Sequence, residues 1–307
     1  MNKEILQSEE RQGIVMDVDH FAVHDGPGIR TCIYLKGCPL SCAWCHSPES
    51  QSPAPQLLFA QSRCTGCGRC AVVCPAGVHR FADSRHILDR GECLVCGNCA
   101  QACPTGALSV SGRLMKVDEV VREALADRVF YENSGGGVTL SGGEVLFQAA
   151  FARQVLSCLK GQGIHTIVET SGFGREDALL SLVAVTDLFY FDYKLADIGL
   201  FKRFTNGDPG LVLRNLKSLR AVTDRIVLRM PLIPGITDTV ENVAAGFTLA
   251  DDLGIQFVHL LPYNASASAK YAWIGQEYPL GLLEARTGLH AELRALAPPG
   301  LVVEIIS

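Results

Sequence analysis

Residues 37–46 read Gly-Cys-Pro-Leu-Ser-Cys-Ala-Trp-Cys-His, and their cysteines, Cys38, Cys42 and Cys45, are separated by three residues and then by two. A cubic 4Fe–4S cluster contains four irons and normally takes four cysteine ligands. Three thiolates therefore leave one iron open to a substrate or cofactor. The alternative is a zinc knuckle completed by His46, but a knuckle does not account for the rest of the chain. This loop predicts an iron–sulfur cluster with a catalytic role.

The chain is rich in cysteine, and 11 of its 13 cysteines lie between Cys38 and Cys103. Residues 1–12 are polar and charged and contain no apolar stretch of signal-peptide length. We therefore expect an intracellular protein in which the cysteines bind metal rather than form disulfides. Two cysteines are left over, Cys32 in a strand pattern and Cys158 in a helical pattern. We expect both to be buried free thiols.

Two further cysteine blocks begin at Cys64 and Cys93 and share the spacing C-x2-C-x2-C-x3-C-P. Their starts are 29 residues apart, which indicates an internal duplication. The spacing is that of bacterial ferredoxins with two 4Fe–4S clusters, in which the fourth cysteine of each block ligates the other cluster. Structural zinc, the alternative, uses four ligands in C-x2-C pairs and leaves the eight cysteines and the prolines unexplained. The ferredoxin rule predicts two ligand sets: Cys64, Cys67, Cys70 and Cys103 for one cluster, and Cys93, Cys96, Cys99 and Cys74 for the other.

Outside these blocks the chain alternates between strand patterns and helical patterns, which indicates parallel βα units. Seven strands are too few for an eightfold barrel, so we expect an α/β fold with an open, partial (β/α)6 TIM-like barrel. Polar residues at the carboxyl ends of its strands would build the site. The expected strands are 31–36, 137–140, 165–169, 187–192, 225–229, 256–260 and 301–306, and the expected helices are 117–130, 145–159, 177–185, 211–221, 240–253 and 282–296.

The cysteine blocks also divide the chain into domains. Residues 53–112 are too few and too rich in cysteine to depend on an apolar core, so metal clusters would take its place. We expect this segment to be a ferredoxin-like insert that binds two 4Fe–4S clusters. Residues 1–52 and 113–307 would form the barrel.

Composition excludes several classes of function. The chain has 307 residues, 48% of them hydrophobic, which is enough for a sizeable core. Its formal net charge is −5 and it has no basic block, so we expect no nucleic-acid partner. No run approaches the ~18 apolar residues of a membrane span. We expect a soluble, cytoplasmic protein that does not bind membranes.

The cysteine triplet and its surroundings resemble the radical S-adenosylmethionine (SAM) superfamily. Within it, the chain is similar to the glycyl radical enzyme activating enzymes, the family of pyruvate formate-lyase activating enzyme. The insert resembles that of a larger subgroup, because the activator of pyruvate formate-lyase itself lacks one. The segments that carry the resemblance are 13–17, 24–31, 35–40, 135–139, 169–172, 192–194, 231–235 and 260–263.

The resemblance implies an enzyme, a radical SAM oxidoreductase working in an anaerobic setting. The reduced cluster would cleave SAM into methionine and a 5′-deoxyadenosyl radical. This radical would take a hydrogen atom from a glycine of a partner glycyl radical enzyme, leaving 5′-deoxyadenosine. The implied cofactors are three 4Fe–4S clusters, one at the SAM site and two in the insert, together with SAM and, as an option, a monovalent cation. The implied electron donor is flavodoxin or ferredoxin, and we expect a monomer.

The resemblance also assigns roles to individual residues. Trp44, Cys45 and His46 would flank the cofactor, and Gly143, in the Ser-Gly-Gly-Glu turn after the second expected strand, would hold its amino group. The remaining implied positions are Asp192, Tyr193 and Lys194 for the cofactor, Glu169 and Thr170 for the cation, Asn264 at a cofactor-contacting position where many members have histidine, and residues 25–28 beside the glycine loop of the partner.

Other functions compete with this interpretation. A plain electron-transfer protein explains the eight cysteines of the insert but not the triplet. A radical enzyme for a small molecule explains the triplet but not the His-Asp-Gly-Pro-Gly segment at 24–28, which is typical of activators of proteins. The insert would either relay electrons to the catalytic cluster or brace the surface on which the partner docks. The partner stays open among a sulfonate lyase, a choline lyase, a diol dehydratase and an arylacetate decarboxylase.

Overall fold

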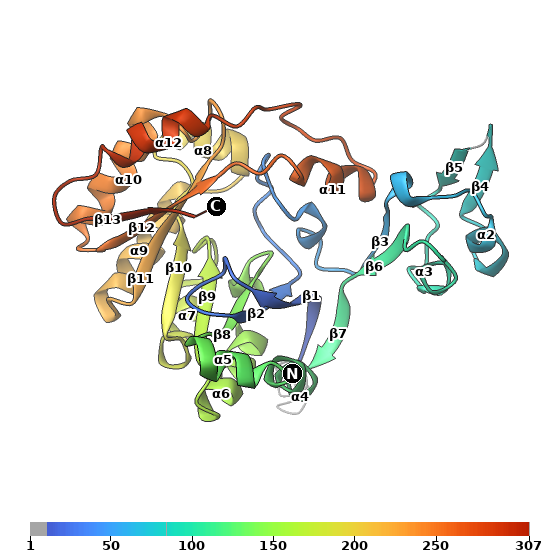
Figure 1. Cartoon of the computed structure of the whole chain (residues 1–307), viewed down its shortest axis with the longest axis horizontal. Helices are drawn as coiled ribbons and strands as arrows, with labels where there is room; N and C mark the ends of the chain where they lie inside the picture. Colours follow the sequence, from blue (N-terminus) through green and yellow to red (C-terminus); the bar gives the residue numbers. More distant parts are fainter. Residues whose placement is uncertain (1–10, 84, 307) are drawn as a thin grey trace.

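The computed structural model describes residues 11–83 and 85–306. Most of the segment 1–12, in which no signal peptide is expected, therefore lies outside the described residues. Nine strands form one sheet in the order β13-β12-β11-β10-β9-β8-β2-β1-β7 (Figure 1). Seven of them run parallel, and they are the seven that the sequence predicts, so the α/β prediction is confirmed. These strands are β2 (Arg30–Leu35), β8 (Gly137–Gly142), β9 (His165–Thr170), β10 (Leu188–Asp192), β11 (Ile226–Leu232), β12 (Phe257–Pro262) and β13 (Val302–Ile305).

Two strands that the sequence did not predict extend the sheet beyond β2. β1 (Gln12–Ala22) pairs antiparallel with β2, and β7 (Arg113–Lys116) pairs antiparallel with β1. β7 has only four residues, too few for an alternating pattern to stand out from a turn. Because β7 follows the cysteine blocks directly, it returns the chain from them to the sheet.

The six expected helical segments all contain helix, with some divisions. The segment 117–130 divides into α4 and α5, and the segment 177–185 divides into α7 and a 3-10 turn. Within residues 11–83 and 85–306, no helix has the length and apolar character needed to cross a membrane. The helices are α4 (Val117–Leu125), α5 (Arg128–Ser134), α6 (Ala149–Gly161), α7 (Glu176–Leu180), α9 (Pro209–Val222), α10 (Val240–Asp252) and α12 (Thr287–Arg294).

Two helices that follow the main parallel strands were not predicted, α8 (Ile198–Thr205) and α11 (Ala267–Trp273). The start of α8 is marked by Asp197, whose carboxylate accepts a hydrogen bond from the Leu200 N–H at 2.7 Å. Its end is marked by Asn206 in the left-handed conformation. Both are ordinary signals of a helix boundary, so α8 was predictable. α11 has no side-chain cap at its start and offers no such signal.

The core lies between the sheet and its helices. Of the two cysteines outside the three cysteine groups, one is buried in this core and the other is exposed. Cys32 in β2 is fully buried, as predicted. The prediction for Cys158 is wrong, because this thiol is exposed. The inward face of α6 is filled by larger side chains, including Phe151, Val155 and Leu159, so Cys158 lies on the solvent side of its helix.

The two cysteine blocks fall between β3 (Gln56–Phe59) and β6 (Leu108–Ser111), which pair antiparallel. In Figure 1 this part of the chain lies to one side of the main sheet, beyond α11. It has a small apolar cluster of its own, to which Leu57, Phe59 and Leu108 belong. The other elements here are α2 (Arg69–Val73), the hairpin of β4 (His79–Ala82) and β5 (Arg85–Leu88), and α3 (Asn98–Gln101).

The entry into β8 passes very close to the entry into β2. A Cβ atom on Gly136 would lie 1.8 Å from the carbonyl oxygen of Ile29, which belongs to fixed backbone. We predict that Gly136→Ala destabilises the protein by about 3 kcal/mol, since neither chain can move away without breaking the pairing of β2 with β8. Differential scanning calorimetry would show this as a lower Tm.

Gly161→Ala is the matched control for this glycine. A Cβ at Gly161, the last residue of α6, meets nothing within 4 Å. Alanine favours a helix over glycine by up to about 1 kcal/mol, so this variant should melt at or above the temperature of the parent. Equal melting of the two variants would contradict the close approach at Gly136.

Candidate functional site

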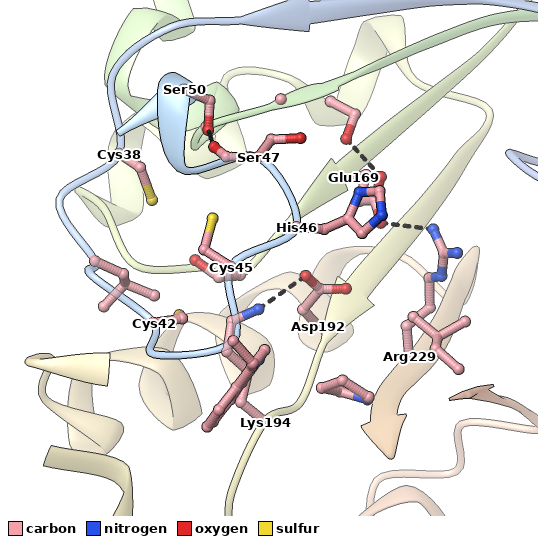
Figure 2. A pocket seen from close by; sticks show the side chains of 18 of the residues that line it. Cys38, Cys42, Cys45, His46, Ser47, Ser50, Glu169, Asp192, Lys194 and Arg229 are labelled. Atoms are coloured by element: carbon pink, nitrogen blue, oxygen red, sulfur yellow. Dashed lines mark hydrogen bonds and ion pairs between the residues drawn. The ribbon is translucent and has the colours of Figure 1, made fainter. Parts of the chain in front are cut away.

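The carboxyl ends of the parallel strands surround a cavity of about 380 Å³. Figure 2 shows side chains from the loop after β2 and from the ends of β9, β10 and β11 pointing into this space. Parallel sheets place their sites at this edge because all the strands end there. The polar residues that line the cavity include Asp25, Cys38, Cys42, Cys45, His46, Ser141, Glu169, Thr170, Ser171, Asp192, Lys194, Arg229 and Asn264.

The loop after β2 brings the three cysteines of the triplet to one wall of the cavity. The Cys38 N–H donates to the carbonyl of Gln51 at 3.1 Å, and the Ala43 N–H donates to the carbonyl of Phe204, at the end of α8, at 2.8 Å. Within the loop, the Cys45 N–H donates to the Cys42 carbonyl at 3.0 Å. The backbone therefore holds the loop at both ends and in the middle.

The three thiols of this loop lie in a poorly solvated place. Burial raises the pKa of Cys38, Cys42 and Cys45, that of Cys42 to about 12. Metal binding needs the thiolate form, so the ionised loop requires positive charge beside it. These donors fit a 4Fe–4S cluster, because three cysteine sulfurs line one cavity. The irons of a cluster would supply the positive charge that the thiolates require.

Lys194 is the cation that acts on the thiols of Cys42 and Cys45, since it opposes the rise of their pKa. Its Nζ lies 3.0 Å from Oδ2 of Asp192, and both side chains are mostly buried. Burial alone would lower the pKa of Lys194, but Asp192 and the thiol of Cys42 outweigh it and raise the pKa. The other oxygen of Asp192, Oδ1, is buried and has no hydrogen-bond partner among the described residues. This unpartnered oxygen can accept a hydrogen bond from a group that binds in the cavity.

A second ion pair, between Glu169 at the end of β9 and Arg229 in β11, lies across the cavity. Arg229 Nη1 lies 2.6 Å from Glu169 Oε1, and the Ser141 hydroxyl donates to Glu169 Oε2 at 2.5 Å. Burial raises the pKa of Glu169, and Arg229 acts against that rise. The guanidinium also lies over the ring of Tyr190, 4.8 Å from its centroid. Arg229 Nε is buried without a partner among the described residues.

Arg229 was not among the site residues predicted from the sequence. The signal was present, because Arg229 is a charged residue inside an otherwise apolar run that forms a strand buried on both faces. An arginine is almost never fully buried unless it is paired. It therefore indicated an acidic partner elsewhere in the sheet, which is Glu169 of β9.

The Ser-Gly-Gly-Glu turn after β8 lies against the cysteine loop. A Cβ on Gly143 would lie 2.5 Å from the carbonyl oxygen of Gly37, so only glycine fits there. The next residue, Glu144, is buried and joins the turn to the end of β9. Its Oε1 accepts from the Leu146 N–H at 3.1 Å and from the Thr170 hydroxyl at 2.5 Å, and its Oε2 accepts from the Ser171 N–H at 2.9 Å and from the Ser171 hydroxyl.

Most of the residues that the resemblance assigns to the cofactor line this cavity, and one does not. Tyr193 is partly buried and packs against the apolar core, away from the cavity. Thr170 lines the cavity, but its hydroxyl is engaged with Glu144. Burial lowers the pKa of His46, and Lys270 lowers it further. The assigned residues that line the cavity are Trp44, Cys45, His46, Gly143, Glu169, Thr170, Asp192, Lys194 and Asn264.

The cysteine blocks between β3 and β6 line two separate cavities. Cys64, Cys67, Cys70 and Cys103 line one of them. Cys74, Cys93, Cys96 and Cys99 line the other. These are the two groups of four that the ferredoxin rule pairs across the blocks, and a set of four thiols around one small cavity fits a 4Fe–4S cluster. Ligation of the clusters stays a prediction.

Another cavity, of about 560 Å³, lies on the far side of the loop that contains Asp25. Asp25 itself lines the central cavity, whereas His24, Gly26 and Pro27 line this second one. Its remaining walls come from the strands β10 to β13. The loop at 24–27 therefore lies between the central cavity and a second, wider cavity at the amino-terminal halves of β10, β11 and β12.

Comparison with known proteins gives a consistent result. The family model of the radical SAM superfamily matches residues 32–245. The chain is 41% identical to the benzylsuccinate synthase activating enzyme of Thauera aromatica, over 86% of this chain and 82% of that protein. It is 40% identical to the trans-4-hydroxy-L-proline dehydratase activating enzyme of Clostridioides difficile, over 86% of this chain and 89% of that protein. Among solved structures, Streptococcus suis SuiB bound to its precursor peptide SuiA is similar in fold alone, with a TM-score of 0.51 and 13% identity over 91% of this chain and 49% of that one.

The hydrogen bonds of Glu144 give a testable prediction. Each of its oxygens accepts from a backbone N–H, so an amide nitrogen fits in neither place. We predict that Glu144→Gln lowers the free energy of unfolding by about 2 kcal/mol, since a buried donor would face a buried donor. Glu176→Gln, at an exposed residue of α7, is the matched control and should leave the Tm unchanged. A stable Glu144→Gln variant would show that Glu144 does not organise the turn.

Proposed function

Since this chain belongs to the radical SAM superfamily and, within it, to the glycyl radical enzyme activating enzymes, we propose that the cavity of Figure 2 is its SAM site. Cys38, Cys42 and Cys45 would ligate the catalytic cluster there. The observation that carries the proposal is that one cavity holds three partly buried thiols together with two ion pairs that each leave a polar atom free.

The chain is an oxidoreductase that activates a partner glycyl radical enzyme. Cys38, Cys42 and Cys45 would hold a cluster that, when reduced, would supply the one electron needed to cleave SAM to methionine and a 5′-deoxyadenosyl radical. This radical would take a hydrogen atom from a glycine of the partner and become 5′-deoxyadenosine. The protein itself needs no general base or nucleophile for this reaction. Its residues bind and orient the cofactor and keep water out.

We assign the individual contacts from the atoms that are free to make them. Asp192 Oδ1 and Arg229 Nε, both buried and unpartnered, would bind the amino acid part of SAM. Gly143 lets the backbone of the turn approach the cofactor amino group, and Asn264 can donate and accept hydrogen bonds at the end of β12. A monovalent cation would be held beside the cofactor by oxygens of Glu169 and Thr170, with help from Asp192.

The partner glycine would reach the cofactor through the second, wider cavity. The loop at 24–27 forms part of the wall between the two cavities, with Asp25 on the cofactor side. A glycine loop entering from the wider cavity would therefore pass the β10 residues that line this cavity, and then Asp25, before it reaches the cofactor. We propose that the activator works as a monomer.

The insert, residues 53–112, would bind the two further 4Fe–4S clusters, and residues 1–52 and 113–307 would form the partial (β/α)6 barrel. The two cavities with four cysteines each support this division. We propose that the insert relays electrons from flavodoxin or ferredoxin to the catalytic cluster. The alternative is that the insert only braces the surface on which the partner docks.

The identity of the partner is not decided by similarity. The relatives include activating enzymes of benzylsuccinate synthase, choline trimethylamine-lyase, trans-4-hydroxy-L-proline dehydratase and isethionate sulfite-lyase at 37–41% identity. Such similar values for such different partners give no preference among them. A neighbouring gene that encodes a glycyl radical loop is the observation that would choose.

Cleavage of SAM tests the proposed site. We predict that the reduced, reconstituted protein forms methionine and 5′-deoxyadenosine from SAM, measured by liquid chromatography. Cys42→Ala should abolish the products, because it removes a cluster ligand. Cys158→Ala, which removes an exposed thiol outside the site, should leave them unchanged. With the neighbouring glycyl radical enzyme present, the parent should also produce an EPR doublet, and products without a doublet would argue against that partner.

The role of the insert is tested separately. We predict that Cys67→Ala and Cys96→Ala each remove about four irons per chain, since each cysteine would ligate a different 4Fe–4S cluster. Both variants should keep SAM cleavage with a chemical reductant and lose most of it with reduced flavodoxin. Equal cleavage with both reductants would support a bracing role, and unchanged iron content would overturn the insert clusters.

A further inference from the structure

The hairpin of β4 and β5 connects the two cysteine blocks and carries two histidines that the proposed function does not use. His79 lies on β4 and His86 on β5, and their side chains are 5% and 7% exposed. His79 Nδ1 lies 2.9 Å from His86 Nε2, so the two imidazoles are joined by one hydrogen bond. Two buried histidines bonded to each other between two proposed redox sites need a physical explanation.

His86 also contacts the sulfur atoms of the first cysteine block. Its Nδ1 lies 3.7 Å from Cys64 Sγ, and its Nε2 lies 3.8 Å from Cys70 Sγ. The ring is held between two phenylalanines. It stacks on Phe81 at 4.6 Å between centroids and packs against Phe59 at 4.4 Å. His86 therefore keeps one orientation toward the thiols.

The pair extends from one insert cavity to the other. His86 lines the cavity of Cys64, Cys67, Cys70 and Cys103. His79 lines the cavity of Cys74, Cys93, Cys96 and Cys99. The hairpin thus gives each proposed cluster one histidine neighbour, but the two neighbours do not offer the same atoms.

The hydrogen-bond pattern has a preferred direction. A hydrogen bond between two imidazole nitrogens needs an N–H on one ring and a lone pair on the other, and a neutral imidazole has one of each. If His79 Nδ1–H donates to His86 Nε2, then His86 Nδ1–H is free to donate to Cys64. The opposite direction would bury the N–H of His79 Nε2, an atom that has no partner among the described residues. A buried donor without an acceptor is costly, so the first direction is favoured.

We propose that the His79–His86 pair makes the two insert clusters unequal: His86 donates a hydrogen bond to the Cys64 sulfur, which raises the reduction potential of the cluster bound by Cys64, Cys67, Cys70 and Cys103 above that of its neighbour. Hydrogen bonds to cluster sulfurs and solvent exposure set such potentials. The bond strengthens when the cluster gains an electron, because the sulfur becomes more negative. His79 offers the second cluster no N–H, so that cluster lacks this effect.

This inference rests on the proposed clusters of the insert, and it adds that a single electron entering the insert settles on the first cluster. His86 is a tuning residue that acts through a ligand, and it does not touch the cofactor SAM. Its effect should therefore appear in a potential, whether or not the enzyme is turning over.

The test is a potentiometric titration followed by EPR. The full chain carrying Cys38→Ala, Cys42→Ala and Cys45→Ala is used, so that only the insert clusters contribute. This parent should contain about eight irons and show two separate midpoint potentials. Absence of those irons would overturn the insert clusters themselves and not only the role of the histidines.

His86→Phe removes the donor and keeps an aromatic ring between Phe59 and Phe81. We expect the higher potential to fall by about 59 mV, a tenfold change in a one-electron equilibrium, and the lower potential to stay. His86→Gln, which retains an N–H, should recover part of the fall. Ile87→Gln, at an exposed neighbour on β5, is the matched control and should change neither potential.

His79→Leu covers the case in which His86→Phe fails to keep its iron. This variant leaves His86 in place but removes the group that fixes its N–H, so a smaller fall of the same potential is expected. An unchanged higher potential in whichever of the two variants retains about eight irons overturns the proposal. An equal fall of both potentials also overturns it, because it would reflect a general change in solvent access.

Discussion

The site depends on the parallel pairing of β2 with β8 and on the backbone contact that continues it past the ends of both strands. The Gly143 N–H donates to the Leu35 carbonyl at 2.8 Å, and the Glu144 N–H donates to the Gly37 carbonyl at 2.9 Å. No side chain fits between the two chains at Gly143. The cysteine loop and the glycine turn, more than 90 residues apart in sequence, are therefore joined at this point by main-chain hydrogen bonds.

The rest of the cavity is placed by steps outward from this contact. Glu144 carries the connection from β8 to the turn at Thr170 and Ser171, after β9. Glu169, at the same strand end, then binds Arg229 of β11. These contacts run from β8 to β9 and then, past the intervening β10, to β11. In the same way α8, through its last carbonyls, fixes the outer side of the cysteine loop.

The sequence was most informative where chemistry and periodicity act locally. All seven parallel strands and the two groups of insert cysteines could be predicted, because an apolar run and a cysteine spacing are properties of short segments. Glu144 could not be assigned in this way, since its role depends on partners from another strand. The buried charge of Arg229 indicated an acidic partner but did not identify it. Cys158 was misjudged because a helical pattern alone does not say where the helix turns outward. The histidine pair of the hairpin has no sequence signature, because it arises only when β4 and β5 pair.

The two ion pairs of the cavity explain why it suits a ligand with both charges. A buried pair gains little for stability, because both ions lose their hydration. Here each pair also leaves an atom unpartnered, Oδ1 of Asp192 and Nε of Arg229. An unsatisfied buried polar atom costs about 1–3 kcal/mol, so the cavity is less stable empty than filled. The amino acid part of SAM carries one ammonium, which can donate to the free oxygen of Asp192, and one carboxylate, which can accept from the free N–H of Arg229. The same charges that destabilise the free protein would therefore favour binding of the cofactor and set its orientation beside the cysteine loop.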